Sequence, residues 1–166
     1  MEADLKSACE MLAKRTLPRW NELPDLELYM DQVTSLIGRY LKDDRELTAS
    51  MVNNYVKHKA MPAPVRKKYT REHLAYLIVI CTLKPVLPIS TIRQMIDDEL
   101  AVQNLQLFYD AFCTLFENTC RETAARHLKN ENLSHSSTLC RAALCAKAEQ
   151  SLALQMAATQ SSGETE

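Results

Sequence analysis

The sequence contains very little glycine. Only Gly38 and Gly163 occur in 166 residues, and Gly163 lies near the C-terminus. Glycine lets a backbone approach a phosphate closely, so this scarcity argues against a Rossmann or P-loop enzyme. An all-β fold would also need glycine in several tight turns. The chain is 46% hydrophobic and 25% charged, which is typical of a globular protein, and its lack of glycine favours helices.

Long hydrophobic runs are also missing. The longest apolar run, residues 74–83, has ten residues, whereas a helix that spans a bilayer needs about 20. The first residues, Met1-Glu2-Ala3-Asp4, carry acid where a signal peptide carries base. We therefore expect a cytoplasmic protein that has no membrane partner.

Motifs for metal binding and catalysis are absent as well. None of the six cysteines forms a CxxC pair, so in a reducing compartment they are most simply buried apolar residues. A metal or thiol sensor built on Cys113 and Cys120 is disfavoured, because seven residues separate them by about 10 Å along a helix. The other members of that candidate cluster are Cys140, Cys145, His127 and His135. The adjacent Glu72 and His73 lack a nucleophile fixed beside them, so we expect neither a cofactor nor an enzyme.

The spacing of apolar residues predicts a mainly α-helical protein. Thr48 and Thr70 are expected N-caps, as are Asp25 and Ser90. We divide the chain into an N-terminal helix (1–19), a central domain (20–98), a helical C-terminal region (99–158) and a flexible tail (159–166). Helices are expected over residues 2–14, 26–41, 48–58, 70–83, 90–96, 101–128 and 137–158.

Positive charge is concentrated in one internal block. Residues 48–96 hold eight basic residues and a single acid, Glu72, giving +7, while the flanking parts carry −3 and −5. Such a block is either a solvated surface or a binding face for an anionic partner. Six of its basic residues fall within fifteen positions: Lys57, Lys59, Arg66, Lys67, Lys68 and Arg71.

The order of helix, connector (42–46), short helix (48–58) and basic arm resembles a helix-turn-helix with a wing. The second helix of such a unit enters the major groove. Its exposed side would offer base-reading side chains, because asparagine bonds adenine bidentately and lysine contacts guanine or phosphate. The predicted base-reading residues are Ser50, Asn53, Asn54 and Lys57. The predicted phosphate-binding residues are Lys59, Arg66, Lys67, Lys68 and Arg71, with Tyr55 and Tyr69 as further donors. The alternative is that the two asparagines are ordinary surface residues.

Three stretches carry a family resemblance. Residues 47–64, LTASMVNNYVKHKAMPAP, resemble the recognition-helix region of MerR-type regulators. Residues 68–74, KYTREHL, resemble the end of their wing, and residues 86–96, VLPISTIRQMI, their following short helix. The span 20–96, including DLELYMDQ at 25–32, is more similar to a bacterial domain-of-unknown-function family with such a winged-helix core. The resemblance implies a transcriptional regulator whose basic wing is formed by Arg66, Lys67 and Lys68.

The sequence departs from the MerR pattern at the recognition helix. Asn53 and Asn54 stand where MerR-type proteins usually carry arginine and tyrosine, and Lys59 replaces the glycine that follows the helix. The arm between Pro64 and Tyr69 is short and contains no glycine, so the wing is expected to be truncated. Base preference therefore cannot be carried over from the family.

The helix predicted over residues 101–128 carries a broad aromatic stripe. In MerR-type regulators a long helix in this place pairs two copies, so a homodimer is one expectation. The other is that the stripe packs on Leu36 and Ile78 in the chain's own core. We expect a sequence-specific regulator that binds double-stranded DNA, with no effector identifiable. The alternative is a non-catalytic protein-interaction module whose basic face docks an acidic protein. The stripe consists of Phe108, Tyr109, Phe112, Leu115 and Phe116.

Overall fold

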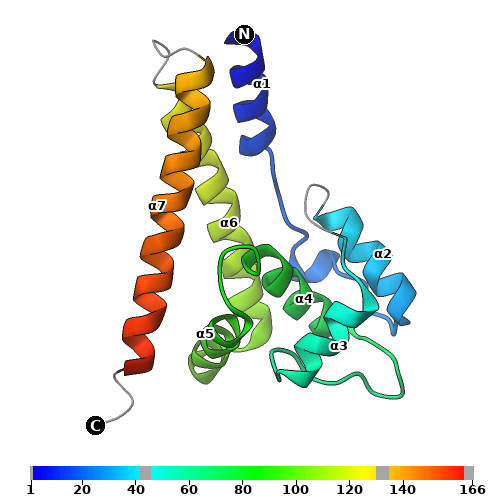
Figure 1. The fold of residues 1–166 in the computed structure, drawn as a ribbon. Helices are drawn as coiled ribbons and strands as arrows, with labels where there is room; N and C mark the ends of the chain where they lie inside the picture. The colour runs from blue at the N-terminus through cyan, green and yellow to red at the C-terminus, as the bar shows by residue number, and fades with distance from the viewer. Residues whose placement is uncertain (1, 42–45, 130–134, 163–166) are drawn as a thin grey trace. The chain divides into compact units, whose positions relative to one another are not determined.

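The computed structural model describes residues 2–41, 46–129 and 135–162 (Figure 1). These residues are mainly helical, as predicted, and β structure among them is limited to two isolated bridges. Residues 42–45 of the predicted connector and residues 163–166 of the predicted tail lie outside the described residues, whereas residues 159–162 of that tail are helical. The elements are α1 (Glu2–Ala13), a 3-10 helix (Trp20–Glu22), α2 (Met30–Tyr40), α3 (Ala49–Lys57), α4 (Arg71–Leu83), α5 (Ile89–Val102), α6 (Leu105–Leu128) and α7 (His135–Ser162).

The chain divides into two compact units. One comprises residues 17–114 and holds α2 to α5 with the first part of α6. The other comprises residues 1–16 and 115–166 and holds α1, the rest of α6 and α7. Within the described part of the chain, no helix is both long and apolar enough to cross a membrane.

The start of α2 differs from the prediction. Asp25 does not cap a helix, because residues 25–28 precede α2 and Leu28 forms an antiparallel bridge with Tyr69. The two backbone N–H groups of that bridge each donate to the opposite carbonyl at 2.8 Å. These bonds occupy the backbone of Leu28, so the helix begins at Met30, after the Tyr29 N–H has donated to the Gln32 side chain. Short-range spacing did not reveal this long-range pairing.

The predicted cap of α3 is confirmed. The Thr48 hydroxyl accepts a hydrogen bond from the Met51 N–H at 3.2 Å. At the other end, the Lys59 N–H donates to Val56 and the Ala60 N–H to Tyr55, at 2.9 and 3.0 Å. This pair of bonds is the Schellman motif, whose left-handed position is usually glycine. Lys59 takes that position here, with φ of 56°.

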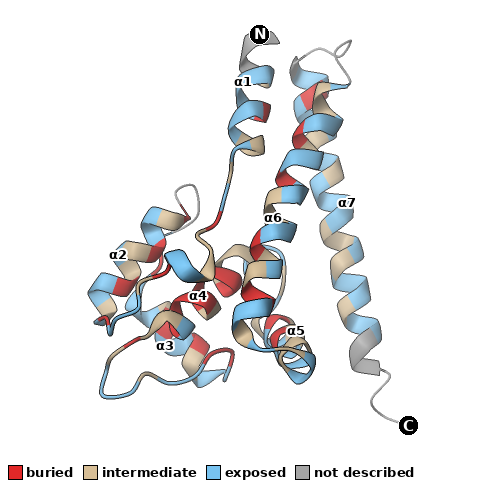
Figure 2. Cartoon of the chain, turned by 180° about the vertical axis from the view of Figure 1, so that it is seen from behind, coloured by how far each residue is buried: buried red, intermediate tan, exposed pale blue. Residues whose placement is uncertain are grey.

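The core of the first unit is centred on α4, whose residues 73–80 are buried except for the half-buried Tyr76 (Figure 2). Thr70 is its N-cap residue, as predicted. α5 starts at Ile89 after Pro88, so Ser90 lies inside the helix rather than at its cap. The core side chains of α4 and α5 with less than 2% exposure are Leu74, Ala75, Leu77, Ile78, Val79, Ile80, Ile92 and Ile96.

Only the first part of the aromatic stripe of α6 packs inside the first unit, whereas Leu115 and Phe116 belong to the second unit and Leu115 is 65% exposed. α5 extends to Val102, and α6 begins only at Leu105, so the single helix predicted from residue 101 is broken. Phe108 and Tyr109 are 7% and 0% exposed. The Tyr109 hydroxyl donates to the Pro18 carbonyl at 2.7 Å, and its ring meets Trp20 edge-on at 6.3 Å. The chain's own core therefore uses these two aromatic side chains.

The second unit buries few of its described side chains and exposes much of α7 (Figure 2). The Arg15 guanidinium lies over the Phe116 ring at 5.6 Å, and Arg126 pairs with Glu149 at 2.9 Å. The large apolar side chains of α7 that are more than half exposed are Leu139, Leu144, Leu152 and Met156.

The predicted burial of the cysteines holds for three of them. Cys9, Cys113 and Cys120 are buried, and burial raises the pKa of the Cys9 and Cys120 thiols. Cys140 is exposed, and Cys81 and Cys145 are half-buried. Among the described residues, no three His, Cys, Asp or Glu side chains are grouped to hold a metal ion. The His135 side chain, a member of the candidate sensor cluster, lies outside the described residues.

Candidate nucleic-acid interface

The exposed face of α3 is polar, and its opposite face is core. Val52 and Tyr55 are 0% and 2% exposed and anchor the helix. Residues three, four and seven positions apart share one helix face, so the polar residues of α3 lie together on the outside. The exposed polar residues of this face, all of them predicted, are Ser50, Asn53, Asn54 and Lys57.

The basic arm is a two-residue hairpin. Val65 and Lys68 form an antiparallel bridge, and the Lys68 N–H donates to the Val65 carbonyl at 2.9 Å. The two central residues, Arg66 and Lys67, have φ of 51° and 63°, as in a type I′ turn. Such turns usually contain asparagine or glycine, because a Cβ disfavours this backbone. The turn thus projects two exposed cationic side chains from adjacent left-handed positions.

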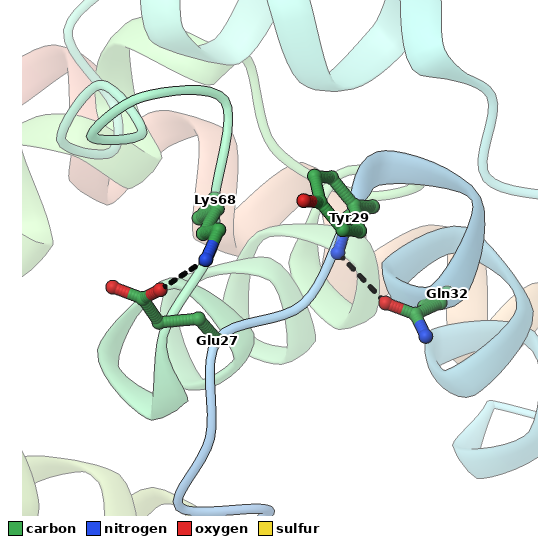
Figure 3. A network of polar contacts seen from close by, with 4 residues as sticks. All are labelled: Glu27, Tyr29, Gln32 and Lys68. Atoms are coloured by element: carbon green, nitrogen blue, oxygen red, sulfur yellow. Dashed lines mark hydrogen bonds and ion pairs between the residues drawn. The ribbon is translucent and has the colours of Figure 1, made fainter.

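Lys68 is tied to the segment before α2. Its ammonium lies 2.7 Å from a Glu27 carboxylate oxygen and 5.9 Å from the centre of the Tyr29 ring (Figure 3). The hydrogen bond from Lys68 to Glu27, followed by the charge of Glu27, raises the pKa of Lys68. Glu27 and Tyr29 flank Leu28, the residue that bridges to Tyr69. Lys68 was predicted to bind phosphate, but this contact engages it within the chain.

Arg71 also serves the fold. Its Nε donates to the Leu23 carbonyl at 3.1 Å, and its guanidinium lies 5.9 Å from the Trp20 ring centre. A second nitrogen of the group lies 3.7 Å from Asp25. Arg71 therefore fixes residues 20–25 to the start of α4, and its side chain is only 21% exposed.

The prediction that Tyr55 and Tyr69 donate to phosphates is wrong. They are 2% and 3% exposed, so their rings fill the core beneath α3 and the arm. Burial raises the pKa of Tyr55 to about 12 and also raises that of Tyr69. The spacing of Tyr55 from Val52 already places the two residues on one helix face, a signal against surface exposure.

His73 joins the two ends of the arm, a role that the sequence analysis missed. Its Nδ1 accepts from the Thr70 N–H at 3.0 Å, and its Nε2 lies 3.4 Å from the Ala63 carbonyl. The ring also meets Tyr69 edge-on, with centroids 5.4 Å apart. An Nδ1 that accepts leaves the proton of the neutral ring on Nε2, facing Ala63. His73 is 5% exposed, and this burial lowers its pKa.

The exposed cations of the predicted set are therefore fewer than the sequence indicated. Lys57 and Lys59 stand at the C-terminal end of α3, and Arg66 and Lys67 at the tip of the arm. Two acids near the arm pair with cations of the predicted set, Glu27 with Lys68 and Asp25 with Arg71. The polar face of α3 and the short cationic hairpin expose amide, hydroxyl and cationic donors, which are the groups that an anionic partner can accept bonds from.

Comparison with known proteins gives one match. No curated protein and no solved structure matches the chain. One protein family, described as Domain of unknown function (DUF1836), matches residues 18–112. This range coincides closely with the compact unit of residues 17–114 and covers more than half of the sequence. It includes α3, the arm and the buried α4. The chain therefore belongs to the DUF1836 family.

Proposed function

We propose that this protein is a sequence-specific DNA-binding protein that acts as a transcriptional regulator. α3 would lie in the major groove, and the arm would contact the phosphate backbone. The observation that carries the proposal is the two-sided character of α3. One side is fully packed into the core, while the other exposes four side chains that can bond base edges or phosphates. A helix used in this way needs a rigid inner face and a polar outer face.

The outer face of α3 suits base recognition. Asn53 and Asn54 each carry an amide that can bond adenine bidentately in the major groove. Ser50 lies three residues before Asn53, and Lys57 follows Asn53 by one helical turn, so all reach the same side. The resemblance to MerR-type regulators supports the same assignment of α3.

The proposed phosphate contacts are fewer than those predicted from the sequence. Lys68 and Arg71 already bond within the chain, so we assign the backbone contacts to Lys57, Lys59, Arg66 and Lys67. Each neutralised phosphate contributes about −0.9 to the slope of log K against log salt, so four contacts give a slope of about −3.6. This salt dependence is less steep than the full basic block would produce.

A homodimer through the helix predicted at 101–128 remains a proposal. Selected DNA tests it directly, because a dimer related by a two-fold axis recovers inverted half-sites about one helical turn apart. A monomer recovers a single half-site.

A second candidate function is a protein-interaction module. It is favoured by α7, where Leu139, Leu144, Leu152 and Met156 are more than half exposed. In this view the basic face of α3 and the arm docks an acidic protein. Protein docking of this kind shows no base preference, which separates it from the first proposal.

The experiment is selection of bound duplexes from a random pool at near-physiological salt. We expect a motif, and we expect Asn53→Ala to relax one position by about 1–3 kcal/mol, or roughly 5- to 150-fold. The double change Arg66→Glu/Lys67→Glu should weaken binding to all sequences and flatten the salt slope. Lys129→Glu/Lys147→Glu, which makes the same change in net charge at two exposed positions outside the proposed interface, is the control. Folded protein that enriches no sequence refutes the proposal.

A further inference from the structure

We infer that Glu27 is a positioning residue for the basic arm. Its carboxylate holds Lys68 so that the arm is formed before DNA is bound. Of the three cations of the arm, only Arg66 and Lys67 are then presented to the phosphodiester backbone. The inference rests on the proposed function and deepens it, because it divides the arm into a supporting residue and two ligand-binding residues.

The contacts place Lys68 between two residues of one extended segment. Lys68 precedes Tyr69, and Glu27 and Tyr29 lie on either side of Leu28, which bridges to Tyr69. The Lys68 ammonium is 2.7 Å from Glu27 and 5.9 Å from the Tyr29 ring centre, so both neighbours face it (Figure 3). Cross-strand neighbours of this kind stabilise an antiparallel pair and fix its register.

The arm needs such support because its turn is strained. Arg66 and Lys67 both carry a Cβ in the left-handed region, at φ of 51° and 63°. Backbone of this kind persists only where the surrounding structure holds it. A short hairpin by itself is marginally stable in water. His73 secures the ends of the arm at Ala63 and Thr70, whereas Glu27 secures the returning strand beside the turn itself.

Positioning and plain electrostatics predict opposite effects of removing Glu27. Glu27 is an acid beside a face that binds a polyanion, so by charge alone its loss strengthens DNA binding and frees Lys68 as another cation. If Glu27 positions the arm, its loss weakens binding, because a mobile arm must be ordered when the complex forms. The sign of the change therefore separates the two roles.

The test compares Glu27→Gln with the unmodified protein and with Asp31→Asn. Asp31 is another exposed acid, in the first turn of α2, and serves as the matched charge control. The probe is the duplex recovered by selection, or a random-sequence duplex at low salt if none is recovered. We expect Glu27→Gln to weaken binding two- to fivefold, since an exposed ion pair contributes modestly, with an unchanged salt slope. Asp31→Asn should leave binding unchanged or strengthen it.

A second readout does not depend on DNA. Amide relaxation of Arg66 and Lys67 should show larger motion on the nanosecond timescale in Glu27→Gln than in the unmodified protein or in Asp31→Asn. Glu27→Gln that binds as tightly as the unmodified protein, or more tightly, with equally ordered arm amides, overturns the inference. If the unmodified protein binds no duplex, the proposed function fails, and the amide relaxation alone decides whether Glu27 holds the arm.

Discussion

Lys59 offers a substitution that should stabilise the protein while removing a proposed DNA contact. It occupies the left-handed position after α3, at φ of 56°, within a Schellman motif that is otherwise fully bonded. Glycine adopts this backbone without steric cost, whereas any residue with a Cβ strains it. Lys59→Gly and Lys59→Ala remove the same charge, so their difference isolates the backbone.

The magnitude follows from two opposing terms. Left-handed backbone costs a residue with a Cβ about 1–2 kcal/mol. Glycine lowers the free energy of unfolding by about 0.4–1 kcal/mol, because it increases the entropy of the unfolded chain. Lys59→Gly should therefore exceed Lys59→Ala in free energy of unfolding by about 1 kcal/mol. For a chain of 166 residues this corresponds to a difference of about 2–4 °C in Tm.

Thermal and urea unfolding followed by circular dichroism measure this difference. The matched control is Asn53, an exposed residue in the middle of α3. There the order should reverse, with alanine more stable than glycine by about 1 kcal/mol, because glycine is a poor helix former. If alanine were the more stable residue at both positions, the strain assigned to Lys59 would be wrong.

Two further predictions concern buried polar groups. His73 is neutral when folded, with a lowered pKa, so the unfolded chain binds a proton first as pH falls. Below about pH 6.5 the free energy of unfolding should fall by about 1.4 kcal/mol per pH unit until the folded ring titrates. His73→Gln should lose this pH dependence in urea unfolding. A free energy of unfolding that rises on acidification would contradict the neutral buried ring. Tyr109→Phe removes the hydrogen bond to Pro18 and should cost about 1–2 kcal/mol, whereas the exposed Tyr29→Phe should cost under about 0.5 kcal/mol. Equal costs in the same unfolding assay would show that the bond to Pro18 contributes nothing.

Local signals were sufficient for the helices and for much of the candidate interface. Thr48 and Thr70 were identifiable as caps, because a hydroxyl before an apolar repeat satisfies a helix terminus through residues three positions away. The same spacing separated Val52 and Tyr55, which face inward, from Asn53 and Asn54, which face outward. Assigning Tyr55 to phosphate binding ignored this periodicity and gave weight to its hydroxyl alone.

Contacts between distant residues decided what the spacing did not show. Asp25 was expected to cap a helix, but Leu28 pairs with Tyr69, 41 residues away, and delays α2 to Met30. Lys68 was expected on the surface with its neighbours, but Glu27 engages it across the same bridge.

The sequence by itself determined that the chain is helical, where most of its helices begin, and which face of α3 is polar. These properties depend on residues within about one helical turn, so their pattern is visible along the chain. Only the tertiary structure decided which cations remain available to a partner. Lys68 and Arg71 are engaged within the chain because the fold brings Glu27 to Lys68 and Leu23 to Arg71. The energy of a charged group depends on such spatial neighbours rather than on its own position in the sequence.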